Sequence, residues 1–80
     1  MYIQVNGEER EVALNLSLNE LIDHLDLAPE RIAIELNQKV VRRADWSITH
    51  LQENDRVEVV HFVGGGNYQD AGAVARRQEQ

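Results

Sequence analysis

Cysteine is absent from this chain of 80 residues. Its absence excludes a disulfide scaffold, a cysteine-ligated zinc site and a thiol nucleophile. A chain of this length allows one small domain, which must depend on its apolar core for stability. A reducing compartment suits such a protein, so we expect it to be cytoplasmic.

Long apolar runs are missing as well. No segment approaches the length of a membrane span. The first ten residues, MYIQVNGEER, contain neither a basic start nor a hydrophobic segment. We therefore expect no membrane anchor and no signal peptide.

Positive charge is in the minority, because 14 Asp and Glu residues face 8 Lys and Arg residues, for a net charge of −6. The excess lies within residues 1–66, since residues 67–80 are neutral overall. An acidic surface disfavours a phosphate backbone, so we expect no nucleic-acid partner. Docking onto basic protein surfaces suits the acidity, and so does plain solvation of the surface.

Recognisable catalytic and metal-binding patterns are also lacking. His24, His50 and His61 are scattered and have no cysteine near them, so we expect no metal site. No serine stands with a histidine and an acid in a known triad pattern, and no phosphate-binding loop is present. The sequence therefore predicts no metal site, no catalytic triad and no phosphate-binding loop, and so no cofactor bound by the chain itself.

Two β-rich segments open the chain. Residues 1–5 alternate, Asn6-Gly7 is a strong signal for a two-residue hairpin turn, and Glu11–Leu14 is expected to return as the second strand. Side chains alternate across a strand, so one face of this hairpin should be apolar. The residues expected on that face are Ile3, Val5, Val12 and Leu14.

A short helix is expected next. Ser17 and Glu20 have the spacing of a capping box, and Pro29 requires that the helix has ended by Ala28. Apolar residues then recur at i, i+3, i+4 and i+7, which is one stripe of a helix. They are Leu18, Leu21, Ile22 and Leu25.

Three more strands are predicted in the second half of the domain. Ile32–Leu36 is expected to be buried on both faces, Val40-Val41 to be short, and Arg56–Phe62 to be the last strand. Asn37-Gln38 should turn the chain between the first two of these strands.

A polar segment with one aromatic residue separates the short strand from the last one. Residues 42–46 are expected to form a 3₁₀ turn. Trp46 and Leu51 are expected to close one end of the core.

The order hairpin, helix, strand, short strand and strand predicts an α+β fold. It is the order of a β-grasp (ubiquitin-like) roll, a mixed four- to five-stranded sheet packed on one helix. In that roll the first and last strands lie parallel in the middle of the sheet. The chain would then leave the domain from a rigid central strand.

Three glycines, Gly64, Gly65 and Gly66, follow closely on the last predicted strand. Without Cβ atoms the backbone can stay extended and enter a narrow slot. This property suits a protein whose C-terminal carboxylate must be reached by another enzyme. A flexible linker or a turn is the alternative interpretation.

The composition changes after Gly66. Residues 67–80 contain only Tyr68 and Val74 as large apolar residues. We expect a flexible extension, with one or two helical turns over Ala71–Arg76 at most. The chain is therefore divided into a folded domain, residues 1–66, and an extension, residues 67–80.

The last strand offers a candidate docking surface. Val60 and Phe62 should share one face, and the other face carries Val57, Val59 and His61. A single helix can cover only one face, so an apolar patch should remain exposed beside the glycines. Coverage of Val60 or Phe62 by a loop is the alternative.

Several segments together resemble the bacterial ThiS-type sulfur carrier proteins of thiamine biosynthesis. They are Glu20-Leu21-Ile22 with Leu25, the stretch Ala33–Val41 that contains Asn37-Gln38, then Trp46, then Asn54-Asp55-Arg56-Val57, and finally the glycines. The resemblance covers residues 1–66. The strand–Asn-Gln–strand segment with the later tryptophan is the more specific part, because glycine ends also occur in molybdopterin-type carriers and in ubiquitin.

The resemblance implies a function as a protein cosubstrate, monomeric when free. An E1-like adenylating enzyme, which supplies ATP and magnesium, activates the carboxylate of the last glycine. A sulfur donor then replaces AMP to give a thiocarboxylate, from which thiazole synthase takes the sulfur. By position the sulfur-carrying residue is Gly66, and Gly64 and Gly65 are the flexible arm.

The chain departs from the family pattern after Gly66, which is amide-bonded to Asn67 and so has no free carboxylate. Three explanations are open: a processing protease removes the extension, the extension is an artefact of the gene boundary or of the expressed chain, or the protein is a binding module that carries no sulfur. Removal by a protease is the interpretation we favour. The alternative functions are a ubiquitin-like protein modifier, a molybdopterin-type carrier and a non-catalytic β-grasp binding module.

Overall fold

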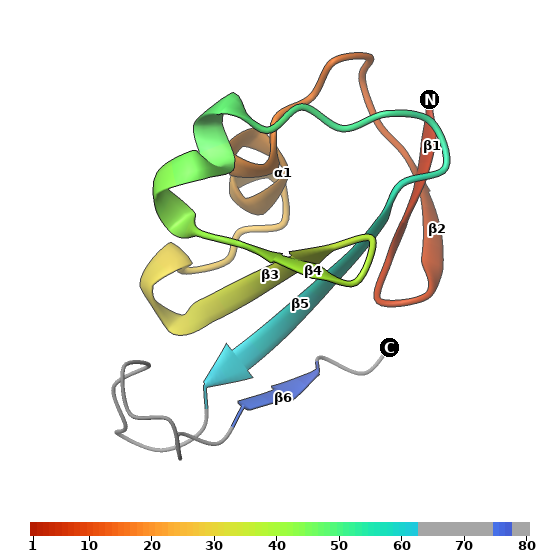
Figure 1. The fold of residues 1–80 in the computed structure, drawn as a ribbon. Helices are drawn as coiled ribbons and strands as arrows, with labels where there is room; N and C mark the ends of the chain where they lie inside the picture. The colour runs from red at the N-terminus through yellow and green to blue at the C-terminus, as the bar shows by residue number, and fades with distance from the viewer. Residues whose placement is uncertain (63–74, 78–80) are drawn as a thin grey trace.

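The structure, a computed structural model, describes residues 1–62 and 75–77. Within these residues, two short 3₁₀ segments, η1 and η2, accompany one α-helix and six strands (Figure 1). In chain order they are β1 Tyr2–Val5, β2 Glu8–Glu11, α1 Leu18–His24, η1 Pro29–Arg31, β3 Ile32–Leu36, β4 Lys39–Val41, η2 Arg43–Ile48, β5 Arg56–Phe62 and β6 Ala75–Arg77.

The strands form one mixed sheet with the order β2-β1-β5-β3-β4, and β6 pairs with β5 beside this path. β1 and β5 are parallel in the middle of the sheet, and each other pair is antiparallel. The helix α1 crosses one face between the hairpin and β3 (Figure 1). The predicted β-grasp roll is therefore confirmed, with β6 as an added strand.

The second strand lies earlier than the sequence predicted. Asn6 and Gly7 form the expected turn, with φ of 51° and 82°. This two-residue turn fixes Val5 opposite Glu8, so β2 runs over Glu8–Glu11 instead of Glu11–Leu14. The geometry of the turn thus determines the register of the hairpin, even though the apolar pattern favours a different one. The outcome is a charged, exposed edge strand, which resists edge-to-edge association.

Leu14 is the residue most affected by this shift. It was expected on the buried face of the hairpin, and it is 78% exposed. Val12 lies just beyond β2 and packs partly against the core.

The helix begins where the capping box was predicted. The Glu20 backbone N–H donates to Ser17 Oγ at 3.1 Å, and the Ser17 backbone N–H donates to Glu20 Oε1 at 2.9 Å. Leu18, Leu21 and Ile22 are buried, as the helical stripe predicted. The helix has ended by Asp26, whose φ is 59°.

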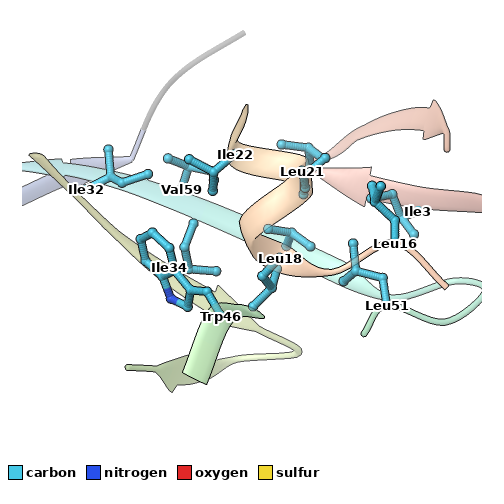
Figure 2. Packing of buried hydrophobic residues seen from close by; sticks show 12 residues of the cluster. Ile3, Leu16, Leu18, Leu21, Ile22, Ile32, Ile34, Trp46, Leu51 and Val59 are labelled. Atoms are coloured by element: carbon cyan, nitrogen blue, oxygen red, sulfur yellow. The ribbon is translucent and has the colours of Figure 1, made fainter. Parts of the chain in front are cut away.

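Side chains from α1, the inner face of the sheet and η2 meet in one apolar core (Figure 2). Trp46 and Leu51 are both buried in it, as expected. The Trp46 ring also donates from Nε1 to the Val41 carbonyl at 2.9 Å, which ties η2 to β4. Among the described residues, the buried apolar side chains all lie within residues 3–59. A chain that ends at Gly66 therefore keeps the whole of this core.

The third strand has the predicted bounds but is not buried on both faces. Ile32 and Ile34 are buried against the helix, whereas Ala33 and Glu35 on the other face are only half-buried. One helix covers one face of this sheet, so the outer face of β3 stays partly open to solvent.

The extension contains a strand where helical turns were expected. Ala75–Arg77 forms β6, which pairs with β5. An isolated helix of one or two turns is marginal in water, and pairing with an existing strand overrides that weak local preference. Residues 63–74 and 78–80 lie outside the described residues, and with them Gly64–Gly66 and most of the segment expected to be flexible.

The capping box makes the stability of the fold depend on pH in the acidic range. The backbone hydrogen bond from Ser17 and a second bond to the Ser17 side chain lower the pKa of Glu20, and His50 and His24 add smaller electrostatic contributions. A carboxyl whose pKa is lowered by folding stabilises the fold above its unfolded pKa and loses that contribution as pH falls through the folded pKa. The stability of the wild-type chain should therefore fall with acid more steeply than that of Glu20→Gln.

Urea unfolding of both chains between neutral pH and about pH 3 measures this difference. Ser17→Ala should lower the free energy of unfolding by about 1 kcal/mol and should also flatten the acid dependence. If the free energy of unfolding changed with pH to the same extent in the wild type and in Glu20→Gln, the capping box would not be the source of the acid dependence.

Candidate functional site

Side-chain hydrogen bonds fix the start of β5. The Arg56 backbone N–H donates to Asn37 Oδ1 at 2.9 Å, and Asn37 Nδ2 donates to Asp55 Oδ1 at 3.0 Å. The Gln52 backbone N–H donates to the other oxygen of Asp55 at 2.8 Å. Two separate segments of the predicted family pattern, one at Asn37 and one at Asp55, thus meet where the last strand begins.

The first half of β5 is held on both edges and on its inner face. Val57 and Val59 are buried against the helix. On one edge β3 pairs with β5 from Val57 to His61. On the other edge Asn6 uses both its backbone and its side chain: its N–H donates to the Val57 carbonyl at 2.9 Å, and its Oδ1 accepts the Val59 N–H at 2.8 Å.

The outer face of β5 becomes apolar toward its end. Glu58 lies opposite Glu35, whereas Val60 lies opposite Ala33. Val60 and Phe62 are half-buried on this face, and Val57 and Val59 alternate with them toward the helix. The structure therefore places Val60 and Phe62 together on the face that α1 does not cover, as the alternation predicted.

A hollow of about 560 Å³ adjoins the same end of the strand. Its apolar lining comes from β3, β4, η2 and the last residue of β5, and Glu30, Arg42 and Arg43 add charge around it. The apolar residues of this lining are Ile32, Ala33, Val40, Val41, Ala44, Trp46 and Phe62. Arg42 forms an ion pair with Asp45 at 3.6 Å. Apolar surface of this kind beside the exit of the chain is suited to docking.

The described residues offer little else that carries chemistry. No group of three His, Asp or Glu residues in residues 1–62 is arranged to hold a metal ion. Within the described part of the chain no helix is long and apolar enough to cross a membrane. The predicted arm and acyl group, Gly64, Gly65 and Gly66, follow β5 in sequence but lie outside the residues that the structure describes.

Comparison with known proteins adds the family. The model of the ThiS family matches residues 3–66. The chain belongs to the ThiS family. The predicted resemblance is thus confirmed, and the family match ends at Gly66 itself.

Solved and curated ThiS proteins agree with this assignment. The crystal structure of a thiamine biosynthesis protein (ThiS) from Geobacter metallireducens is 36% identical with a TM-score of 0.74, and the match covers 82% of this chain and all of that one. The "Sulfur carrier protein ThiS" of Escherichia coli is 27% identical over 66 residues, which is its whole length.

A "Thiazole synthase" of Magnetococcus marinus is 42% identical over 71 residues, or 89% of this chain. The chain spans only 22% of the length of that protein. A match of 71 residues within a chain of 80 must reach position 71 or beyond, so it continues past Gly66. The match is thus not confined to the residues that the ThiS family model covers.

Sequence reasoning did not identify Asn6 as part of this site. The Asn-Gly signal indicated a turn, and it did so correctly, but the second role of the side chain depends on a neighbour 53 positions away. Asn6 takes the place of a strand residue by accepting the Val59 N–H after β1 has ended.

The role of Asn6 can be tested with two substitutions that separate its backbone from its side chain. Asn6→Gly keeps the left-handed backbone accessible but removes the acceptor, and it should lower the free energy of unfolding by about 1 kcal/mol. Asn6→Asp keeps a side-chain oxygen acceptor and should retain most of that stability. Hydrogen exchange of the Val59 amide should accelerate in Asn6→Gly alone, and equal acceleration in both variants would contradict this role.

Proposed function

We propose that this protein is a sulfur carrier for thiazole formation in thiamine biosynthesis, with Gly66 as the residue that carries sulfur. The observation that supports this most strongly is that the match to the ThiS family ends at Gly66, a few residues beyond a strand anchored in the middle of the sheet. The curated relatives named sulfur carriers and thiazole synthase point to the same pathway.

The proposed chemistry begins with hydrolysis of the Gly66–Asn67 amide by a protease. One water is consumed, and the products are the Gly66 carboxylate and the amine of Asn67. The carboxylate attacks the α-phosphorus of ATP, with magnesium, on the adenylating enzyme, giving an acyl adenylate and pyrophosphate. A sulfur donor at the oxidation level of sulfide then displaces AMP and leaves a thiocarboxylate for thiazole synthase.

This chain contributes position and access rather than catalytic groups. The first half of β5 is fixed by β3, by Asn6 and by the loop at Asp55, so the base of the arm has a defined direction. Gly64 and Gly65 then allow a narrow approach to the active site of the partner. The protein is accordingly a cosubstrate and not an enzyme.

The apolar end of the outer face is the proposed docking surface for the adenylating enzyme. Val60 and Phe62 lie directly before the arm, so contact there would bring the terminus to the active site. The excess of acidic residues over residues 1–66 would favour a partner with a basic rim, which would raise the rate of encounter.

Activation of a truncated chain tests the proposed function. The chain ending at Gly66, given its adenylating enzyme, ATP, magnesium and a sulfur donor, should first gain AMP and then exchange one oxygen for one sulfur in its intact mass. The chain of 80 residues should stay unmodified under the same conditions.

A matched control for the truncated chain is Gly65→Val, which keeps the carboxylate and adds a side chain to the arm. It should react more than about tenfold more slowly, because the reacting group no longer reaches its position. An unmodified Gly66 chain beside a competent adenylating enzyme would rule out the carrier function. Isopeptide-linked conjugates in cells would instead support the protein-modifier alternative.

The docking surface can be tested in the chain ending at Gly66. Val60→Asp places a charge in the proposed interface and should raise the KM of the adenylating enzyme for the carrier about tenfold, with little change in kcat. Leu14→Asp makes the same chemical change at an exposed residue away from β5 and should leave KM unchanged. Equal KM values for the two variants would show that the enzyme docks elsewhere.

A further inference from the structure

The two edges of β5 are covered to different extents. β3 follows one edge as far as Ile32 opposite His61. β1 follows the other edge only at Gln4 opposite Arg56 and Val5 opposite Val57. From Val59 onward this second edge, which we call the open edge, is no longer covered by β1.

The backbone groups on the open edge can be assigned from the bonds at Asn6. The Val57 carbonyl and the Val59 N–H both point toward Asn6. Backbone groups alternate between the two edges of a strand, so the N–H and C=O of His61 point to the same side. Unpaired groups on a sheet edge form a template for another strand.

In this chain β6 occupies that template (Figure 1). It runs antiparallel to the end of β5, with Arg77 opposite Val60, Arg76 opposite His61 and Ala75 opposite Phe62. Directly opposed residues of an antiparallel pair exchange both backbone bonds or neither. Since the backbone of His61 faces β6, the N–H of Arg76 faces β5, whereas the N–H of Arg77 points away.

Pairing of β6 also fixes both ends of the segment that contains the glycines. Phe62 and Ala75 lie opposite each other on adjacent strands, about 5 Å apart. The twelve residues between them include Gly64, Gly65 and Gly66.

We propose that β6 is an inhibitory strand, which occupies the open edge of β5 and keeps it from pairing with an extended segment of the adenylating enzyme. The proposal rests on the function proposed above and extends it to a mode of recognition, namely strand addition beside the arm. The strand is only three residues long, so its pairing depends on the covalent link through residues 63–74.

Hydrolysis after Gly66 would then have two effects at once. It liberates the carboxylate, and it converts the pairing of β6 from an intramolecular contact into a bimolecular one. The effective concentration that the link provides is lost with the cut, so the released peptide dissociates and the open edge becomes available.

Two Arg→Pro substitutions in the chain of 80 residues distinguish the loss of strand pairing from the mere change of arginine to proline. Arg76→Pro removes the N–H that faces β5, whereas Arg77→Pro removes one that points away and is compatible with an outer strand. Hydrogen exchange of the His61 amide should accelerate at least about tenfold in Arg76→Pro and in the chain ending at Gly66, but not in Arg77→Pro. The Val60 amide, which faces β3, is the internal control and should not change.

Binding to the adenylating enzyme is the second readout, and it needs no free carboxylate. Arg76→Pro should bind at least about tenfold more tightly than the wild type or Arg77→Pro. Unchanged protection of His61 in Arg76→Pro would overturn the pairing, and unchanged binding despite an exposed His61 would overturn the inhibition. Failure of the carrier function would appear separately, as a Gly66 chain that binds the enzyme but is never adenylated.

Discussion

The unequal pairing along β5 is the constraint on which the rest of the structure depends. At its start this strand is held by β1, by β3 and by the buried side chains of Val57 and Val59. Toward the end of β5, one edge still pairs with β3. The opposite edge is hydrogen-bonded first by Asn6 and then by β6. The start of β5 is therefore paired with strands of the domain on both edges, whereas at its end the pairing of one edge depends on β6. Such an arrangement fixes the start of the strand that precedes the proposed arm in the sequence.

The residues that carry the family resemblance serve this anchoring more than any chemistry. The side chains of Asn37 and Asp55 are hydrogen-bonded to each other, and Asn37 also accepts the Arg56 backbone N–H. These hydrogen bonds fix the loop before the start of β5. Trp46 is buried in the core, and its ring N–H donates a hydrogen bond to the carbonyl of Val41. Under the proposed function the reacting group is the carboxylate of Gly66, so the family pattern within the described residues would record how the sheet is held rather than a catalytic site.

Local signals in the sequence predicted the elements that local physics determines. The capping box at Ser17, the positive-φ turns at Asn6 and Asn37 and the bounds of β5 are all present in the structure. The second strand was wrong because a two-residue turn sets register more strongly than the apolar residue Leu14. Neither the bond from Val59 to Asn6 nor the pairing of β6 with β5 could be predicted, because each depends on partners brought together only by the fold. The positions of Val60 and Phe62 on the uncovered face followed from alternation alone, whereas their role in docking stays a prediction.

The extension links the fold to the proposed activity, because it holds the predicted acyl group as an internal amide and returns to the strand from which the arm departs. The account requires that cells liberate the carboxylate of Gly66. The most direct measurement is the intact mass of the protein isolated from its native cells during thiamine synthesis. We predict a species that ends at Gly66, with a fraction in which sulfur replaces one oxygen. Recovery of only chains in which the Gly66–Asn67 bond is intact would contradict the carrier function.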